Sequence, residues 1–252
     1  MNEPAETGLP QGEAANTGLP QGEAANTGLP QGEAKVKAVD AMFDAIAPRY
    51  DLLNRLLTFG MDVGWRRKTV KSLQLSPGSK VLDLACGTGD LCRELAKRGY
   101  RPVGVDRSAG MLAAQRTSAP LVRGDALVLP FRSNSVDGIV CGFALRNFAS
   151  LKPFLVECAR VLRPGGRVAL LEVAEPGNPV LRWGHGQYFG RVVPLVGGML
   201  SDADAYQYLP KSVAYLPTPN RMVAMMAESG FGAAARRPLS TGIAQLLTGT
   251  RR

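Results

Sequence analysis

Two glycines and an aspartate in the first half of the chain have the spacing of a nucleoside-binding site. Gly87 and Gly89 follow an apolar run at residues 81–85, which is typical of a buried strand. Glycine after such a strand lets the backbone approach a ligand closely. Asp106 ends the next strand-like run, where a carboxylate can accept hydrogen bonds from both hydroxyls of a ribose. Together these residues indicate a cofactor that contains adenosine.

The residues around the glycines narrow the choice of cofactor. A dinucleotide fingerprint needs a third glycine where this chain has Cys92, and no Gly-x-x-x-x-Gly-Lys-Ser/Thr loop is present for a nucleoside triphosphate. The chain instead reads Asp83-x-Ala85-x-Gly87-x-Gly89. This pattern resembles motif I of class I methyltransferases, and that resemblance implies S-adenosylmethionine as the cofactor.

The elements that must position these residues alternate along the chain. Strand-like runs cover residues 81–85, 101–105, 121–123, 137–143 and 167–173, and helix-like segments cover residues 91–97, 109–116 and 151–162. Proline and glycine at residues 163–166 predict a turn before the last of these strands. The alternation predicts a doubly wound α/β fold, with a mainly parallel sheet and helices on both faces. The motif I resemblance implies the Rossmann-like class I methyltransferase sheet of seven strands.

Other notable residues fall at the ends of the predicted strands, where ligands bind in such folds. Asp125 follows the third strand-like run, in a position to accept from an adenine amino group. A turn or helix-capping role is the alternative for this aspartate. Gly142 and Glu172 lie at or near the ends of the next two strands. With one histidine and no Cys-x-x-Cys pair, no metal site is expected.

Three segments outside motif I carry a more specific pattern. Residues 42–54 are followed by Asp62 and Trp65, residues 143–147 read Phe-Ala-Leu-Arg-Asn, and residues 160–167 read Arg-Val-Leu-Arg-Pro-Gly-Gly-Arg. Together these segments resemble the ubiquinone/menaquinone-biosynthesis C-methyltransferases. The similarity runs from about Lys37 to the C-terminus and includes residues 208–213.

That resemblance implies a methyl transfer to a ring carbon of a polyprenylated quinol. Demethylmenaquinol is the favoured substrate, since Asp62 stands where ubiquinone-type relatives more often carry histidine. A ubiquinone precursor (2-methoxy-6-polyprenyl-1,4-benzoquinol), or another lipid or small molecule, is the alternative. The implied cofactor contacts, including motif I, are Asp83, Gly87, Thr88, Gly89, Asp106, Asp125, Ala126 and Gly142. Position 142 departs from the pattern, because many relatives have serine there.

Arg146 and Asn147 are the candidate catalytic residues, because they follow the fourth strand near the expected position of the methyl group. An arginine stays protonated, so we expect it to stabilise a developing phenolate or to position a water rather than to act as a base. His185 has a suitable pKa for a base, although a lone histidine is more often a packing residue. Asp202, Asp204 and Tyr206 are further candidates.

The charge of the chain suggests an anionic partner. The net charge is +9, and the first 34 residues contain five glutamates and no Lys or Arg, so residues 35–252 carry +14. An acidic membrane surface and nucleic acid both fit this charge. The basic cluster after Trp65 suits a lipid surface, and a solvated helix face is its alternative. The apolar residues 192–200 either contact a membrane or an isoprenoid tail, or pack in the core.

Other features of the sequence limit the alternatives. Residues 144–147 lack the Asp/Asn-Pro-Pro-Tyr/Phe sequence of amino-group DNA methylases, and no RNA-binding module is evident, so nucleic acid is not the expected partner. The intact glycine motif argues against a non-catalytic binding protein. The four cysteines read as buried, reduced thiols. We expect a cytoplasmic enzyme, peripherally associated with the inner face of the cell membrane, and a homo-oligomer is compatible with the sequence.

The first 34 residues are expected to be a disordered, low-complexity tail, and residues 35–252 the methyltransferase domain. Thr-Gly-Leu-Pro-Gln-Gly-Glu-Ala occurs three times, starting at Thr7, Thr17 and Thr27. Each copy has one large apolar residue, a leucine, which buries too little surface to offset the entropy of ordering.

Deletion of residues 1–34 is therefore expected to leave turnover nearly unchanged and to shift the melting temperature by less than about 2 °C. Calorimetry on the full-length and truncated proteins measures the difference. A large fall in the melting temperature would show that the repeats pack against the domain.

Overall fold

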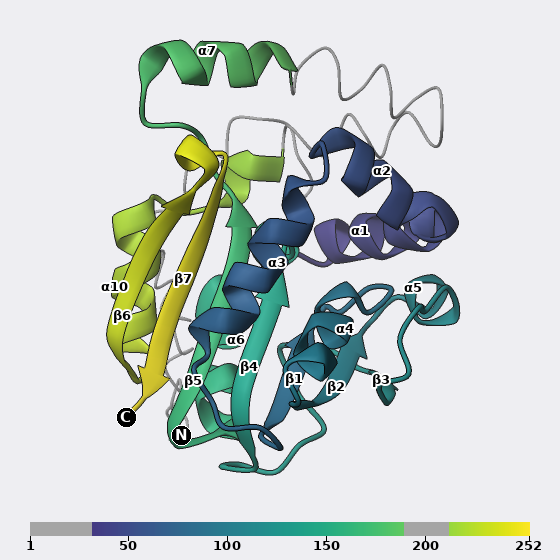
Figure 1. Ribbon diagram of the computed structural model, residues 1–252, viewed down its shortest axis with the longest axis vertical. Helices are drawn as coiled ribbons and strands as arrows, with labels where there is room; N and C mark the ends of the chain where they lie inside the picture. Colours follow the sequence, from purple (N-terminus) through teal and green to yellow (C-terminus); the bar gives the residue numbers. More distant parts are fainter. Residues whose placement is uncertain (1–31, 189–211) are drawn as a thin grey trace, which may run out of the picture.

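A single sheet of seven strands forms the centre of the computed structural model, which describes residues 32–188 and 212–252. The strand order is β3-β2-β1-β4-β5-β7-β6. Strands β1 to β5 pair in parallel, and β7 runs antiparallel between β5 and β6 (Figure 1). The bounds are β1 Lys80–Leu84, β2 Arg101–Asp106, β3 Leu121–Arg123, β4 Val136–Gly142, β5 Leu162–Val173, β6 Phe231–Leu239 and β7 Ala244–Arg251. The predicted fold class is confirmed.

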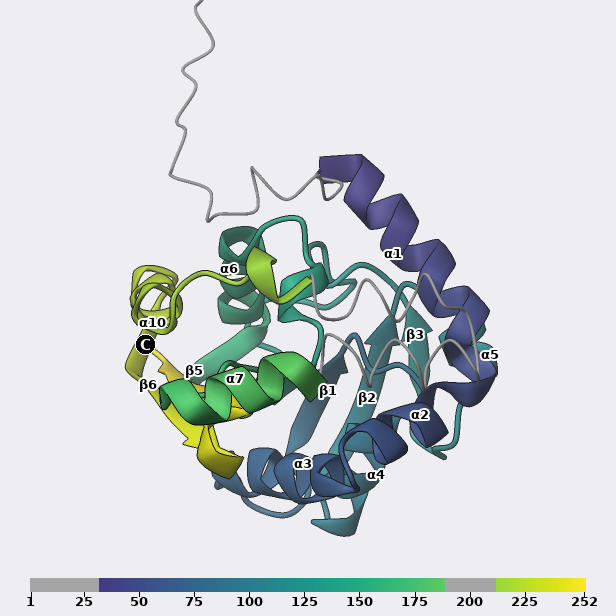
Figure 2. The same ribbon diagram turned by 90° about the horizontal axis from the view of Figure 1, so that it is seen from above.

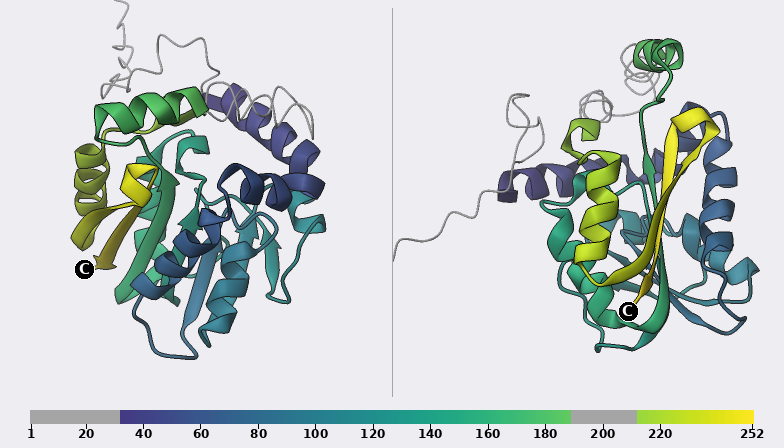
Figure 3. Two further views of the ribbon diagram at one scale, coloured as in Figure 1. Left: turned by 45° about the horizontal axis from the view of Figure 1, so that its top comes forward. Right: turned by 90° about the vertical axis from the view of Figure 1, so that its left-hand side faces the viewer.

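Helices cover both faces of this sheet, as the alternation of elements predicts. On one face lie α3 (Met61–Ser72) and α4 (Asp90–Lys97), and on the other lie α6 (Leu151–Val161) and α10 (Pro219–Glu228) (Figure 3). The remaining helices, α1 (Gly32–Ile46), α2 (Tyr50–Leu57), α5 (Ala109–Ala113) and α7 (Pro179–Gln187), lie toward the carboxyl ends of the parallel strands (Figures 1 and 2). Short 3-10 turns cover Ala47–Arg49, Leu145–Asn147, Val213–Tyr215 and Ser240–Gly242.

The core consists of two apolar layers separated by the sheet. One layer packs Phe154 of α6 and Met226 of α10 against the strands. The other packs Trp65 of α3 and Leu95 of α4 against the opposite face. Because the central strands are buried on both faces, their sequences are continuous apolar runs rather than alternating ones. All four cysteines are buried and free, as predicted.

The N-terminal helices form a separate apolar layer above the strand ends. Buried Ile46, Leu53 and Leu57 pack against Met111 of α5. Pro48 lies in the 3-10 turn that separates α1 from α2, since proline cannot donate the backbone hydrogen bond that would continue the helix. At the start of α1, the buried Lys35 ammonium donates to the Phe148 carbonyl oxygen at 2.9 Å and lies 3.6 Å from the centre of the Tyr215 ring.

Three boundaries differ from the sequence prediction. Helix α1 begins at Gly32, so residues 32–34 belong to the folded part, and residues 1–31 lie outside the described residues. Helix α5 ends at Ala113 rather than at residue 116. Strand β5 starts at Leu162 rather than at Arg167, although residues 163–166 within it have no partner in either neighbouring strand. The register with β4 shifts there, which accommodates Gly165 at φ +78° as an irregularity within the strand.

Candidate active site

The turn between β1 and α4 needs glycine for two reasons. Gly87 and Gly89 have φ values of +56° and +92°, in the left-handed region that favours glycine. A Cβ atom at Gly89 would lie 2.4 Å from Cγ2 of Thr117, which is too close for a side chain. Gly89 therefore packs against Thr117 and does not line a pocket, whereas Gly87 and Thr88 do. We call this cavity the glycine-turn pocket.

Asp106 ties the end of β2 to this turn. Its carboxylate accepts from the Gly87 backbone N–H at 2.7 Å and from the Ser108 N–H at 2.9 Å. Burial raises the pKa of Asp106 despite these two bonds. A carboxylate has about four acceptor positions, so Asp106, which lines the pocket, retains capacity for the hydroxyls of a ligand.

Most of the predicted cofactor residues share this one pocket. It is lined by Asp83, Gly87, Thr88, Asp106, Asp125, Ala126 and Gly142, together with Asn147. Gly89 is the exception among the predicted cofactor residues and lies outside the lining. At Gly142, a Cβ atom would lie 2.9 Å from Cδ1 of Leu91, the flexible end of a side chain. A serine, as in many relatives, would need only a small shift of that leucine.

The glycine-turn pocket is strongly acidic. Six aspartates line it (Asp40, Asp51, Asp83, Asp90, Asp106 and Asp125), and Arg66 and Arg107 are the cations among its described lining residues. Asp83 is completely buried, and burial raises its pKa to about 7. One of its oxygens accepts from the Cys92 N–H at 3.1 Å, and the other has no hydrogen-bond partner in the described part of the chain. The pocket therefore favours a cationic ligand.

Asp125 has the turn role that the sequence offered as one of its two alternatives. Its Oδ1 accepts from the Leu127 N–H at 2.8 Å, which is a local turn contact. Its Oδ2 pairs with Arg107 at 2.8 Å, and Arg107 also reaches Asp40 of α1 at 3.1 Å. The aspartate nonetheless lines the pocket. The turn role is therefore present in the structure, and the adenine contact stays a prediction.

The N-terminal helices are fastened to the rim of the pocket by polar contacts that the sequence prediction missed. Thr88 donates its hydroxyl to the buried Asp51 carboxylate of α2 at 2.7 Å, and Arg116 lies 3.4 Å from the other oxygen of Asp51. Asp44 of α1 accepts from the Ser108 hydroxyl and from the Gly110 N–H. These bonds lower the pKa of Asp44. The acidic residues within helical segments 42–54 were the available signal, but their partners lie 37 to 66 residues away.

A second pocket adjoins the first and is mainly apolar in its lining. We call it the apolar pocket. It lies between α2, α3, α7 and the end of β5, and its apolar residues include Leu57, Met61, Trp65, Val173, Val180 and Ile243. Tyr50, Arg66 and Phe143 line both pockets. The two cavities are therefore neighbours, separated by these three side chains.

Arg146 lines the apolar pocket and not the glycine-turn pocket, whereas Asn147 lines the glycine-turn pocket. The Arg146 side chain is buried and pairs with the fully buried Glu172. Its guanidinium also donates to the Phe143 carbonyl oxygen at 2.8 Å and to the Ser212 hydroxyl at 3.1 Å. The two predicted catalytic residues thus stand on either side of the boundary between the pockets.

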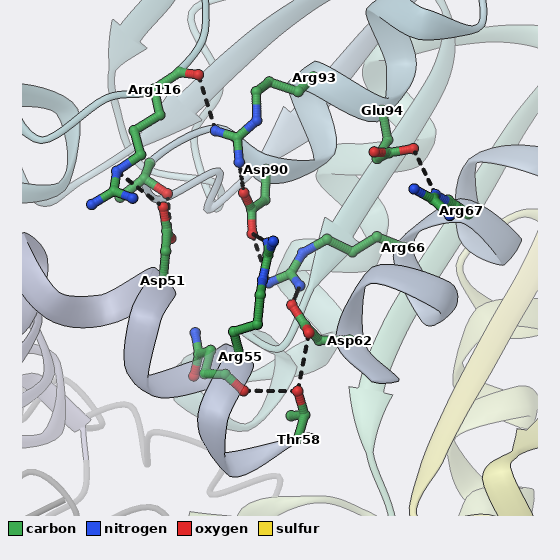
Figure 4. Close-up of polar contacts among 12 residues, drawn as sticks. Asp51, Arg55, Thr58, Asp62, Arg66, Arg67, Asp90, Arg93, Glu94 and Arg116 are labelled. Atoms are coloured by element: carbon green, nitrogen blue, oxygen red, sulfur yellow. Dashed lines mark hydrogen bonds and ion pairs between the residues drawn. The ribbon is translucent and has the colours of Figure 1, made fainter. Parts of the chain in front are cut away.

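The structure removes Trp65 and Arg66 from the exposed lipid-binding surface that was one of the two interpretations of this cluster. Trp65 is buried, and its indole N–H donates to the Ser240 hydroxyl at 2.8 Å. Arg66 is also buried and pairs with Asp62 and, at 3.5 Å, with Asp90 (Figure 4). The other three basic residues, Arg67, Lys68 and Lys71, are exposed, and the Arg67 side chain is 65% exposed. The lipid-surface interpretation of Trp65 and Arg66 is wrong.

The further candidates for the base lie in or beyond α7. His185 belongs to α7. Asp202, Asp204 and Tyr206 lie outside the described residues, as does the apolar stretch 192–200. Among residues 32–188 and 212–252, no cluster of metal-ligating side chains is found, and no helix is long and apolar enough to cross a membrane.

Known proteins resemble this chain in sequence over most of its length. Residues 31–251 match the ubiE/COQ5 methyltransferase family. A demethylmenaquinone methyltransferase of Thermus thermophilus is 44% identical, with 83% of this chain and 100% of that protein covered. The ubiquinone/menaquinone biosynthesis C-methyltransferase UbiE of Geobacter sulfurreducens is 40% identical over 85% of this chain and 89% of its own length.

Solved structures resemble it in fold. A methyltransferase of Thermotoga maritima, described as a possible histamine N-methyltransferase, has a TM-score of 0.61 at 16% identity, with 84% of this chain and 99% of that chain covered. Such low identity supports the fold alone. The sequence matches are much stronger, and they show that the chain belongs to the ubiE/COQ5 methyltransferase family.

Proposed function

We propose that this protein transfers the methyl group of S-adenosylmethionine to a ring carbon of demethylmenaquinol, yielding menaquinol. The observation that carries the proposal is the pairing of two adjacent cavities, one acidic and one apolar, that share Tyr50, Arg66 and Phe143. Family membership supports the reaction class, and the named activities of the relatives support the substrate.

The charge of the glycine-turn pocket fits this cofactor. S-adenosylmethionine has a sulfonium and an ammonium group and only one carboxylate, whereas dinucleotides and nucleoside triphosphates are polyanions. Six aspartates against two arginines would repel a pyrophosphate and attract a sulfonium. In this arrangement Asp106 binds the ribose hydroxyls, and Asp125 and Ala126 flank the adenine. The backbone at Gly87 and Thr88 approaches the cofactor closely. Asp83 and Gly142 then face the methionine portion.

The apolar pocket suits a quinol with an isoprenoid tail. The acceptor carbon must reach the sulfonium methyl group in line, at about 3–3.5 Å. A quinol ring placed beside Tyr50 and Phe143 would lie at the boundary with the cofactor. The alternative acceptors are a ubiquinone precursor or another lipid or small molecule. Asp62, the residue that favours the menaquinone branch, is buried and accepts from the Thr58 hydroxyl at 3.0 Å.

Arg146 is proposed to act on the acceptor. Loss of a hydroxyl proton raises the nucleophilicity of the quinol ring, and a fixed positive charge stabilises the phenolate that forms. Glu172 and the Phe143 carbonyl hold the guanidinium in place at the pocket wall. Asn147 is proposed to contact the reacting groups from the cofactor side. The base is not assigned, and His185 stays a candidate for it.

The proposal includes a membrane-dissolved substrate, and with it peripheral association with the inner face of the cell membrane. The net charge of +14 over residues 35–252 supports attraction to anionic lipids, because each well-placed Lys or Arg contributes about 1 kcal/mol. A homo-oligomer remains a prediction.

Asp106→Ala is expected to weaken S-adenosylmethionine binding roughly ten- to a hundredfold, because it removes a charged acceptor worth about 1.5–3 kcal/mol. Isothermal titration calorimetry measures the affinity. Asp137→Ala is the matched control, because Asp137 lies at the opposite end of the sheet and pairs with Arg163. Equal affinities for the Asp106 variant and the wild type would refute the ribose contact.

Arg146→Lys is expected to reduce turnover by about tenfold or more while changing cofactor affinity less than about threefold. Lysine keeps a positive charge beside Glu172, so the buried carboxylate is not left alone, but it cannot reproduce the planar fork of donors. Arg160→Lys serves as the control, since Arg160 also pairs with a glutamate, Glu157, away from both pockets. Unchanged turnover in the Arg146 variant would remove Arg146 from the mechanism.

The substrate is tested with purified protein, methyl-labelled S-adenosylmethionine and quinols in mixed micelles. Demethylmenaquinol should gain one labelled ring methyl faster than the demethylated ubiquinone precursor. Mass spectrometry of the extracted quinones locates the label. Faster labelling of the precursor would assign the ubiquinone branch, and labelling of neither quinol would contradict the proposed substrate class.

A further inference from the structure

Large exposed apolar side chains are concentrated at one end of the molecule. In the described residues there are eight of them, and six come from α2, the turn that follows it and α7. These six are Leu52, Leu56, Phe59, Val180, Leu181 and Trp183, with exposed fractions from 45% to 77%. The other two, Val128 and Val156, lie elsewhere on the fold. We call the group of six the apolar rim.

Contacts join the end of α7 to α2 and to the turn that follows it. The Tyr188 hydroxyl, just after α7, donates to the Leu57 carbonyl oxygen of α2 at 2.9 Å. The Tyr188 ring lies 5.6 Å from the Phe59 ring, centre to centre. Figures 1 and 2 both place α7 and α2 at the carboxyl ends of the strands. The two helices therefore present their exposed apolar residues on the same end.

The rim also opens into the apolar pocket. Phe59, Val180 and Leu181 are exposed and at the same time line that pocket. The pocket in turn shares Tyr50 and Phe143 with the glycine-turn pocket. The rim, the apolar pocket and the glycine-turn pocket thus follow one another from the outer surface inward, and Tyr50 and Phe143 stand at the boundary between the two pockets.

The residues of the rim and the charge around it favour a membrane over a second protein as the binding partner. Exposed apolar clusters mark a binding surface for a protein or a membrane. Trp183 is 70% exposed, and tryptophan is favoured at membrane–water interfaces. The exposed Arg182 provides positive charge within the rim, whereas the charge of the half-exposed Arg55 is shared with Asp90 at 3.7 Å. The domain that bears the rim carries +14, which complements anionic headgroups and would make two copies of this chain repel each other.

We propose that the apolar rim is the surface through which this protein docks on an anionic lipid bilayer. The inference rests on the proposed function for its purpose: the quinol ring enters the apolar pocket from the membrane while the isoprenoid tail stays among the acyl chains. Leu52, Leu56 and Trp183 enter the interfacial region, and Phe59, Val180 and Leu181 form the entrance of the pocket. Docking there directs the cofactor pocket toward the leaflet that holds the substrate.

Tryptophan fluorescence tests the orientation directly, because the chain has two tryptophans with opposite exposure. Trp183 is 70% exposed and Trp65 is 3% exposed. Vesicles of phosphatidylcholine and phosphatidylglycerol, with bromine in the acyl chains, are expected to quench Trp183 in the full-length protein. In Trp183→Phe the remaining emission, from Trp65, should stay unquenched. Absence of quenching in the wild type would overturn the proposal.

Co-sedimentation with the same vesicles tests the rim as a whole. The triple variant Leu52→Ser, Leu56→Ser, Trp183→Ser should bind at least about tenfold more weakly than the wild type, since three apolar side chains no longer transfer out of water. The matched control is Val128→Ser, Val156→Ser, which removes the exposed valines outside the rim and should bind like the wild type. S-adenosylmethionine affinity reports that each variant is folded. Equal vesicle binding of the triple variant and the wild type would refute the rim.

Two further outcomes separate the alternatives. A wild-type dimer in sedimentation velocity that the triple variant dissociates would assign the rim to a second copy of this chain and overturn the proposal. Vesicle binding through the rim without methylation of any quinol would sustain the docking surface and contradict the proposed function. Quinol methylation in micelles without vesicle binding would sustain the proposed function and contradict the docking surface.

Discussion

Six carboxylates around one cavity repel one another, and the fold has to stabilise them before a cationic ligand arrives. It does so in three ways. The buried Arg66 side chain forms ion pairs with Asp62 and Asp90. Backbone N–H groups satisfy both oxygens of Asp106. Asp83 has neither a paired cation nor a full set of bonds, so burial raises its pKa to about 7 instead. A bound sulfonium or ammonium group would supply the charge that this carboxylate lacks.

The position of Arg66 makes the two pockets interdependent. Its guanidinium carbon lies 5.4 Å from the centre of the Phe143 ring, which is 6.1 Å from the Trp65 ring. These side chains pack α3 against the end of β4, and Arg66 and Phe143 border both cavities. A residue that separates two ligands cannot move toward one without changing the space for the other, because interiors are close-packed. The ion pairs that hold Arg66 therefore help to fix the boundary between the two pockets.

The sequence predicts the glycine-turn pocket well because its features are local. Buried parallel strands, glycines at positive φ and Asp106 at a strand end all follow from short runs of residues. The burial of Trp65 and Arg66 does not follow from such local runs, since the hydrogen-bond partner of Trp65, Ser240, lies 175 residues away in the sequence. Residues 163–166 are an intermediate case: Leu162 pairs with Val136, and the continuous pairing of β5 with β4 and β7 begins at Arg167, where the sequence predicts the strand to start. Tertiary contacts decided the case of Trp65, whereas local sequence marked the irregularity at residues 163–166.

Charge is distributed in opposite senses inside and outside this protein. The glycine-turn pocket has an excess of carboxylates, although residues 35–252 carry +14 overall, so most of the positive charge must lie away from the pocket. An interior carboxylate acts on a bound cation over a few ångströms at low dielectric, where screening by salt is weak. The exterior cations act on headgroups through water and only within about a Debye length of 8–10 Å. The two fields therefore do not cancel, and an acidic pocket is compatible with the proposed docking of a basic exterior on anionic lipids.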